Sequence, residues 1–102
     1  MESGSQPIAR RSERMHVQMP VTLRVGSKGQ INDYAASTVD LSNEGVRVRA
    51  MAGLFPGDAV MIVTTVGEQR TLPGRVVWTG LYGTYLEGQA GIEFLRPIAL
   101  PV

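Results

Sequence analysis

The chain has 102 residues, a formal net charge of +1 at pH 7 and no cysteine. A chain of this length forms one domain with a modest core, and without cysteine it has no disulfides, thiolate metal sites or cysteine nucleophiles. His16 is the only histidine, so a histidine-rich metal site and a Ser-His-Asp triad both lack their parts.

The first nine residues, Met1 to Ala9, contain Ser, Gly, Gln and Pro and show no apolar periodicity. This composition predicts a flexible N-terminal arm over residues 1–9, followed by one domain over 10–96 and a C-terminal tail over 97–102. The N-terminus does not have the pattern of a signal peptide, and no apolar run is long enough to span a membrane. We therefore expect a cytoplasmic protein without membrane insertion.

A basic cluster follows the arm. Arg10, Arg11 and Arg14 lie within five residues, and nine of the ten basic residues of the chain are arginine. Guanidinium groups bind phosphate oxygens and the O6/N7 edge of guanine through paired N–H donors. The alternative is a solvated, nonspecific basic patch or a weak nucleic-acid tail.

The next segments alternate between apolar and polar residues in the manner of strands. We predict strands over His16–Val25, Gln30–Leu41 and Val46–Ala50, with a turn at Gly26–Gly29 and a short hairpin loop between Leu41 and Val46. Further strands are predicted over Ala59–Val66, Arg70–Thr79 and Gly91–Leu95. Short strands at this spacing, with little or no helix, indicate an all-β fold and a small antiparallel barrel.

A second polar cluster, Asp40 to Gly45, closes the second predicted strand. In a regular strand Asp40 and Ser42 share a face, so we expect both on the barrel surface while Val39 and Leu41 point into the core. A carboxylate accepts hydrogen bonds from the N–H groups of guanine's Watson–Crick edge. The alternative is that Asp-x-Ser before a turn has a local structural role, in which the side chains bond nearby backbone N–H groups.

The two clusters in this order, R-x-x-x-R (Arg10, Arg14) and then D-x-S-x-x-G (Asp40, Ser42, Gly45), resemble the PilZ domain. The resemblance runs from about Ile8 to Leu95 and includes Gly57, the segment Gly74–Trp78 and the closing segment Gly91–Phe94. It implies a six-stranded antiparallel β-barrel that binds the second messenger cyclic di-GMP.

Carried over to this chain, the resemblance makes Arg10 and Arg14 the ligand clamp and Arg11 a helper. It makes Asp40 and Ser42 contacts to the guanine edge, and it makes Gly45 the turn that keeps the site open. Glu44 departs from the pattern, since many members have glycine there, and an acidic group beside a dianionic ligand is expected to lower affinity.

Five other side chains bear on the site and its surroundings. Trp78 is interpreted as a core or rim residue, with a stacking face for guanine or arginine as the alternative. Arg47 is interpreted as a surface charge that is near enough in sequence to contribute to the site. Tyr82 and Tyr85 are interpreted as loop anchors, and Met51 as a core or gap-filling residue.

The predicted function is that of a non-enzymatic cyclic di-GMP receptor without a cofactor. Ligand binding draws the Arg10–Arg14 arm onto the barrel and alters contact with a protein effector, in bacterial signalling that controls motility or biofilms. One alternative is a PilZ-like protein-interaction module that binds no nucleotide. The other is a small nucleic-acid-binding barrel, which is disfavoured because few aromatic residues are available for base stacking.

Overall fold

The computed structural model describes residues 14–27, 29–51 and 53–98, so the expected arm lies outside the described residues. Six strands follow in chain order: β1 (Pro20–Ser27), β2 (Gln30–Leu41), β3 (Gly45–Ala50), β4 (Ala59–Thr64), β5 (Thr71–Thr79) and β6 (Gln89–Phe94). Within these ranges no helix has the length and apolar character needed to cross a bilayer.

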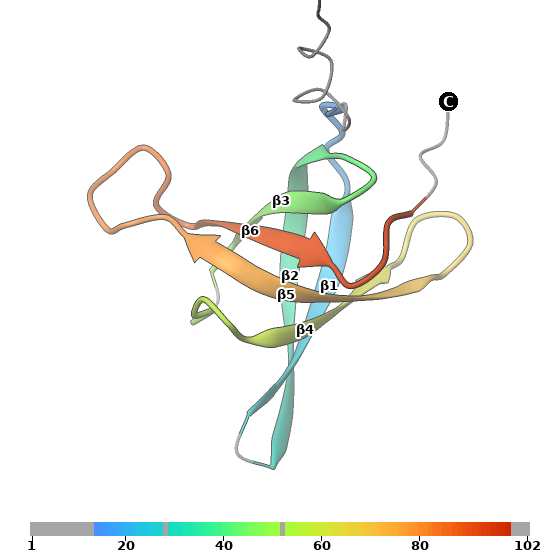
Figure 1. Ribbon diagram of the computed structural model, residues 1–102, viewed down its shortest axis with the longest axis horizontal. Coiled ribbons are helices and arrows are strands. Elements are labelled where there is room, and N and C mark those ends of the chain that lie inside the picture. The colour runs from blue at the N-terminus through green and yellow to red at the C-terminus, as the bar shows by residue number, and fades with distance from the viewer. Residues whose placement is uncertain (1–13, 28, 52, 99–102) are drawn as a thin grey trace, which may run out of the picture.

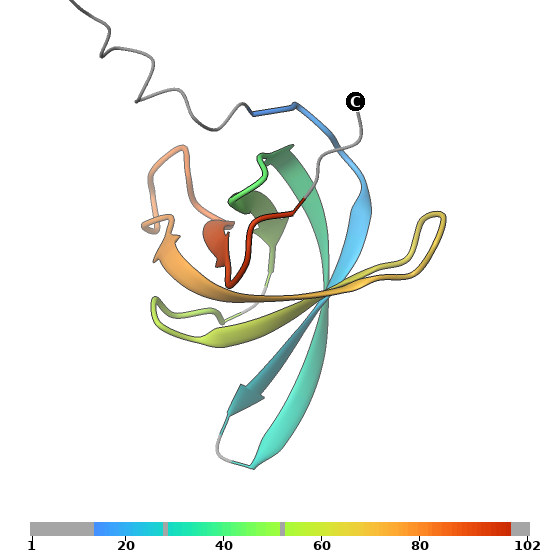
Figure 2. The same cartoon turned by 45° about the vertical axis from the view of Figure 1, so that its right-hand side comes forward.

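The strands close into a barrel in the order β1-β2-β3-β6-β5-β4, and β4 pairs back onto β1 (Figure 1). Each neighbouring pair is antiparallel. The ends of β1 and β2 continue beyond the barrel as a long hairpin, which the rotated view shows clearly (Figure 2). The prediction of an all-β, six-stranded antiparallel barrel is confirmed.

The first strand starts at Pro20, later than the predicted start at His16. The chain before it still runs beside β2, because Met15 and Leu41 exchange backbone hydrogen bonds of 2.7 and 2.9 Å. The Thr38 hydroxyl accepts a hydrogen bond from the Met19 N–H (3.0 Å) and donates to the carbonyl of Val17. Together with a backbone hydrogen bond from the Thr38 N–H to the Met19 carbonyl (2.9 Å), this side-chain pairing fixes the entry of the chain beside the end of β2.

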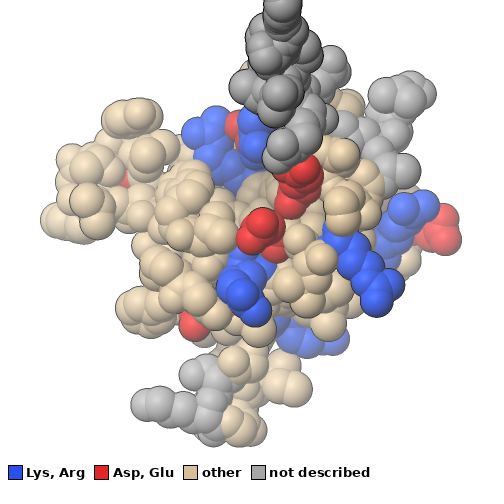
Figure 3. Space-filling model, in the orientation of Figure 1, with Lys and Arg blue, Asp and Glu red and all other residues tan. Residues whose placement is uncertain are grey.

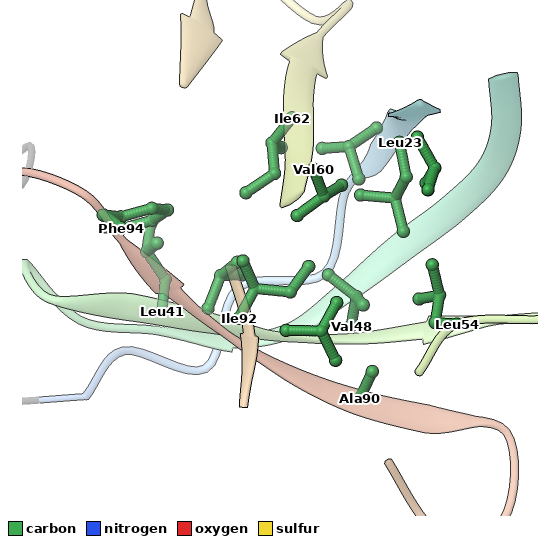
Figure 4. Close-up of a cluster of buried hydrophobic side chains, with 13 residues drawn as sticks. Leu23, Leu41, Val48, Leu54, Val60, Ile62, Ala90, Ile92 and Phe94 are labelled. Atoms are coloured by element: carbon green, nitrogen blue, oxygen red, sulfur yellow. The ribbon is translucent and has the colours of Figure 1, made fainter. Parts of the chain in front are cut away.

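Alternating residues of the strands fill the barrel with a single apolar core (Figure 4). One row of paired residues crosses four strands and is buried throughout: Leu41, Val46, Ile92 and Val76. Beyond the last strand, Ile98 packs against the core, and its N–H donates to the Asn43 carbonyl at 2.8 Å. The packed core therefore holds in place the strands that form the outer face of the barrel.

Two connections expose apolar side chains where the sequence predicted anchors or core. Tyr82 and Tyr85, in the β5–β6 loop, are each 90% exposed, and Met51, after β3, is fully exposed. The loop is anchored by its backbone instead: the Gln89 N–H donates to the Leu86 carbonyl at 3.0 Å. The interpretation of these three side chains as anchors or core is wrong, because all three extend into solvent.

Candidate functional site

Four residues from neighbouring strands form one row on the outer face of the barrel. Asp40 of β2 pairs with Arg47 of β3, Arg47 pairs with Gly91 of β6, and Gly91 pairs with Trp78 of β5. Directly paired residues of a sheet project from the same face, and successive residues alternate between faces. Since the next row fills the core, this row faces outward.

A register shift in β2 turns Asp40 outward. Thr38 pairs with Val48 and faces the interior, and Asp40 pairs with Arg47, so Val39 is the extra residue between them. Without the shift, Thr38 and Asp40 would face the same side of the sheet. An extra residue of this kind bends the strand and changes the direction of the following side chain. Val39, expected in the core, is half-buried at the bulge.

A register shift of the same kind occurs in β5. Val76 pairs with Ile92 in the core, whereas Trp78 pairs with Gly91 on the outer face, and Val77 is the extra residue. The two shifts together bring a carboxylate and an indole onto one face of the sheet. Bulges of this kind are over-represented beside functional sites.

Asp40 is held between two arginines. Arg14 donates to its Oδ1 from Nε at 2.9 Å and from Nη2 at 2.6 Å. Arg47 donates to its Oδ2 from Nε at 3.0 Å and also from Nη2. The Asp40 side chain is only 4% exposed, against 49% for Arg14 and 31% for Arg47. Both carboxylate oxygens are therefore occupied, while both guanidinium groups still reach solvent.

The ionisation of Asp40 follows from these contacts. Burial alone would raise the pKa of Asp40, but the hydrogen bonds and positive charges of Arg14 and Arg47 outweigh burial and hold the pKa below its ordinary value of 3.8. The carboxylate is thus ionised at neutral pH. With two cations and one anion, the Arg14–Asp40–Arg47 cluster has a formal charge of +1.

The expectation that Asp40 and Ser42 lie accessible on the barrel surface is wrong, since their residues are only 3% and 1% exposed. Asp40 does point outward, but the arginines cover it. Ser42 follows the end of β2, and its Oγ accepts hydrogen bonds from the N–H groups of Glu44 and Gly45, both at 3.2 Å. At Ser42 the structure therefore has the alternative arrangement, in which the side chain bonds backbone N–H groups of the local turn.

Two glycines allow close approaches at the site. A Cβ on Gly45 would lie 2.5 Å from the Ile92 carbonyl oxygen, and a Cβ on Gly91 would lie 2.1 Å from Nε1 of Trp78. Neither distance is sterically possible, so a side chain at either position would force a shift. The Trp78 indole therefore lies directly against the backbone of Gly91.

These residues line an open pocket of about 580 Å³ on the outer face of β2, β3, β6 and β5. The lining also contains two acidic residues, Glu44 and Glu93. Basic and acidic side chains lie side by side near the middle of the face shown in Figure 3. The pocket suits a ligand that carries both negative charge and hydrogen-bond donors.

The structure brings together all predicted site residues that it describes: Arg14, Asp40, Ser42, Gly45, Arg47 and Trp78. Arg10 and Arg11 lie outside the described residues. Gly91 and Glu93 were missed as site residues. A glycine inside a strand pattern signals a close backbone approach, so Gly91 could have been found, whereas Glu93 has no distinguishing pattern. In the described part of the chain, no group of three or more His, Cys, Asp or Glu residues could hold a metal ion.

Comparison with known proteins agrees with this architecture. A family model of the PilZ domain matches residues 9–100. Among solved structures, the chain is similar to the crystal structure of the PilZ domain of CeSA from a cellulose-synthesizing bacterium. The two are 26% identical and superpose with a TM-score of 0.62, over 80% of this chain and 79% of that chain. A search of curated proteins finds no match. Because the family model spans most of the sequence, the chain belongs to the PilZ domain family, a family of cyclic di-GMP receptors.

Proposed function

We propose that this chain is a cyclic di-GMP receptor without catalytic activity, and that the pocket beside Asp40 is its ligand site. The observation that carries the proposal is the Arg14–Asp40–Arg47 cluster, which lies in one pocket with the indole of Trp78. Arginine forks bind phosphate, a carboxylate accepts guanine N–H groups, and an indole stacks on a base.

The described pocket lining sets Arg14 and Arg47 against three carboxylates, so the positive charge for an anionic ligand depends on these two arginines and on the segment before them. Cyclic di-GMP carries two phosphate charges, whereas the Arg14–Asp40–Arg47 cluster offers a formal charge of only +1. Arg10 and Arg11 would supply the remaining positive charge from the preceding segment. Glu44 and Glu93 line the same pocket and oppose a dianion, so they are expected to lower the affinity without changing the ligand class.

The unequal exposure of the two arginines suggests how the ligand enters. Arg47 belongs to β3 and is 31% exposed, while Arg14 precedes the first strand and is 49% exposed. We propose that Arg14 leaves Oδ1 of Asp40 and turns to a phosphate, and that a guanine edge takes its place on Oδ1. Arg47 keeps Oδ2 and holds the carboxylate in position.

Ser42 and Gly45 shape the turn beside the pocket, and direct contact of the Ser42 hydroxyl with guanine stays a prediction. Movement of Arg14 would reposition the segment with Arg10 and Arg11. That change would alter the contact with a protein effector, in cytoplasmic signalling of the kind that controls motility or biofilms.

Calorimetric titration with cyclic di-GMP tests the proposal, with cyclic di-AMP as the ligand control. We expect saturable binding of the guanine nucleotide, much weaker binding of the adenine nucleotide, and a change in Trp78 fluorescence on binding. The protein control is Arg49→Gln, which removes an exposed arginine of the same strand as Arg47 and should bind cyclic di-GMP like the wild type. Absence of binding by the full chain at millimolar cyclic di-GMP would favour an interaction module that binds no nucleotide.

A further inference from the structure

Apolar side chains are concentrated on two connections at one end of the barrel. Leu81 (72% exposed), Tyr82 and Tyr85 lie in the β5–β6 loop, and Met51 and Phe55 (67%) lie in the β3–β4 connection. We call these five residues the apolar knob. Soluble domains rarely expose so many large apolar side chains together unless the surface binds something.

The β5–β6 loop is ordered by its own hydrogen bonds. The Thr84 hydroxyl donates to the Leu81 carbonyl at 2.7 Å and accepts from the Leu86 N–H at 3.3 Å. The Gly83 N–H donates to Oε1 of Glu87 at 3.0 Å. Little backbone entropy is therefore lost when this loop is covered.

Parts of the β3–β4 connection are also held by hydrogen bonds, and its start joins the β5–β6 loop at the base of that loop. The Phe55 N–H donates to Oδ2 of Asp58 at 2.9 Å, and the Ala50 N–H donates to the Gly88 carbonyl at 2.8 Å. Figure 1 shows both connections on the left side of the barrel, where the β5–β6 loop projects away from the body. The β5–β6 part of the apolar knob thus projects from the barrel.

The charge of the two connections themselves limits what the apolar knob can bind. Residues 50–58 and 79–90 contain no lysine or arginine, and their only charged residues are Asp58 and Glu87. The projecting part of the surface in Figure 3 is accordingly almost free of charge. An anionic membrane attracts basic residues, and a second copy of this chain would bring acid against acid and one projecting loop against another.

We propose that the apolar knob docks into a concave apolar groove of another protein whose rim is basic. The proposal rests on the proposed function, because that protein would be the effector of the receptor. The connection to the ligand site is direct, since β5 and β6 carry Trp78 and Gly91 and then lead into the loop. Tyrosine is enriched among interface hot spots, where it fills a pocket with its ring and bonds through its hydroxyl.

Photo-crosslinking followed by binding measurements tests this surface. The full chain carries p-benzoylphenylalanine at Tyr82, or at Val66 as the exposed apolar control at the other end of the barrel, in cells of the organism that encodes it. The protein crosslinked at position 82 is identified and purified, and its affinity is measured for the wild type and two double variants. Tyr82→Ser/Tyr85→Ser alters the apolar knob, and Val66→Ser/Leu95→Ser is the matched control.

We expect the apolar-knob variant to bind this partner about 30-fold more weakly or worse, as for loss of a hot spot. The control variant should bind like the wild type, and both variants should keep the wild-type affinity for cyclic di-GMP. The proposal is overturned if position 82 crosslinks no more protein than position 66, or only a second copy of the chain. It is also overturned if the wild type binds phosphatidylglycerol vesicles through Tyr82 and Tyr85, or if the apolar-knob variant binds the partner normally. Failure of wild-type cyclic di-GMP binding would reject the proposed function alone.

Discussion

Two arginine–aspartate pairs of this barrel have the same chemistry and different surroundings. Arg24 donates to Asp33 from Nε at 2.9 Å and from Nη2 at 3.1 Å across β1 and β2. Arg14 donates to Asp40 with similar geometry, but the Asp40 side chain is 4% exposed and that of Asp33 is 46% exposed. Arg47 completes the environment of Asp40, so this carboxylate is held by two arginines, whereas Asp33 is bonded by Arg24.

The difference shows that the surroundings decide what such a pair does. Water screens the exposed pair, so it contributes little to stability. A buried carboxylate depends on its partners, because an uncompensated charge inside a protein is strongly unfavourable. Asp40 therefore fixes two arginines at a pocket, whereas Arg24 and Asp33 form an exposed ion pair on the surface of a hairpin.

The largest effect is expected when both partners of Asp40 are removed. Arg14→Gln/Arg47→Gln should lower the free energy of unfolding by about 3–5 kcal/mol, the range for breaking a buried ion pair from one side. It should also abolish cyclic di-GMP binding. Urea unfolding measures the first effect and calorimetry the second.

The matched control for this variant is Arg49→Gln/Arg75→Gln, which removes the same charge from two exposed positions of the same sheet. Equal destabilisation by the two double variants would contradict the special position of Asp40.

Asp40→Asn should have the next largest effect. The amide keeps the shape but loses the charge, so stability should fall by about 1.5–3 kcal/mol, the value of hydrogen bonds to charged groups. The loss stays below that of the double variant, because Arg14 and Arg47 are partly exposed and can be hydrated.

The same variant should reduce the discrimination between cyclic di-GMP and cyclic di-AMP, because the acceptor for the guanine edge is altered. Parallel titrations of both nucleotides measure this ratio. An unchanged ratio with weaker binding of both nucleotides would assign Asp40 to holding the arginines alone.

Acid should remove the stability that Asp40 contributes. Its pKa is lowered in the folded protein, so the contribution is complete above the ordinary value of 3.8 and is lost as the pH falls through the folded pKa. The stability difference between wild type and Asp40→Asn should therefore be constant near neutral pH and shrink below that value. Unfolding curves at a series of pH values measure it, and a difference that grows on acidification would oppose this sign.

The smallest effect is expected at the exposed pair. Arg24→Gln should leave the unfolding midpoint and cyclic di-GMP binding unchanged within error, because solvent screens this pair and it lies on the β1–β2 hairpin. Destabilisation comparable to that of Asp40→Asn would erase the contrast between the two pairs.

Much of the fold could be predicted from the sequence because strand periodicity and turn residues are local signals. The alternation of apolar residues located all six strands, with errors of a few residues at their ends. The side-chain bonds of Thr38 to the segment before β1 gave no local signal, so the start of that strand was misplaced.

The site was predicted in its composition but not in its geometry. Asp40 and Trp78 face outward only because Val39 and Val77 shift the register, and a single extra residue in a strand of alternating pattern leaves no clear trace in the sequence. The pairing of Asp40 with Arg14 and Arg47 depends on the segment before β1 and on the neighbouring strand β3, so the burial of the carboxylate could not be predicted from residues 40–45 alone.

The central claim is that cyclic di-GMP takes the place of Arg14 at Asp40 while Arg47 stays. Side-chain ¹⁵N NMR of the arginine Nε–H groups, recorded on the full chain during a cyclic di-GMP titration, tests it most directly. We predict that the Arg14 signal shifts on saturation, while the Arg47 signal keeps the position of a group bonded to carboxylate. Arg14 and Arg47 signals that both stay unchanged at saturating ligand would contradict the account.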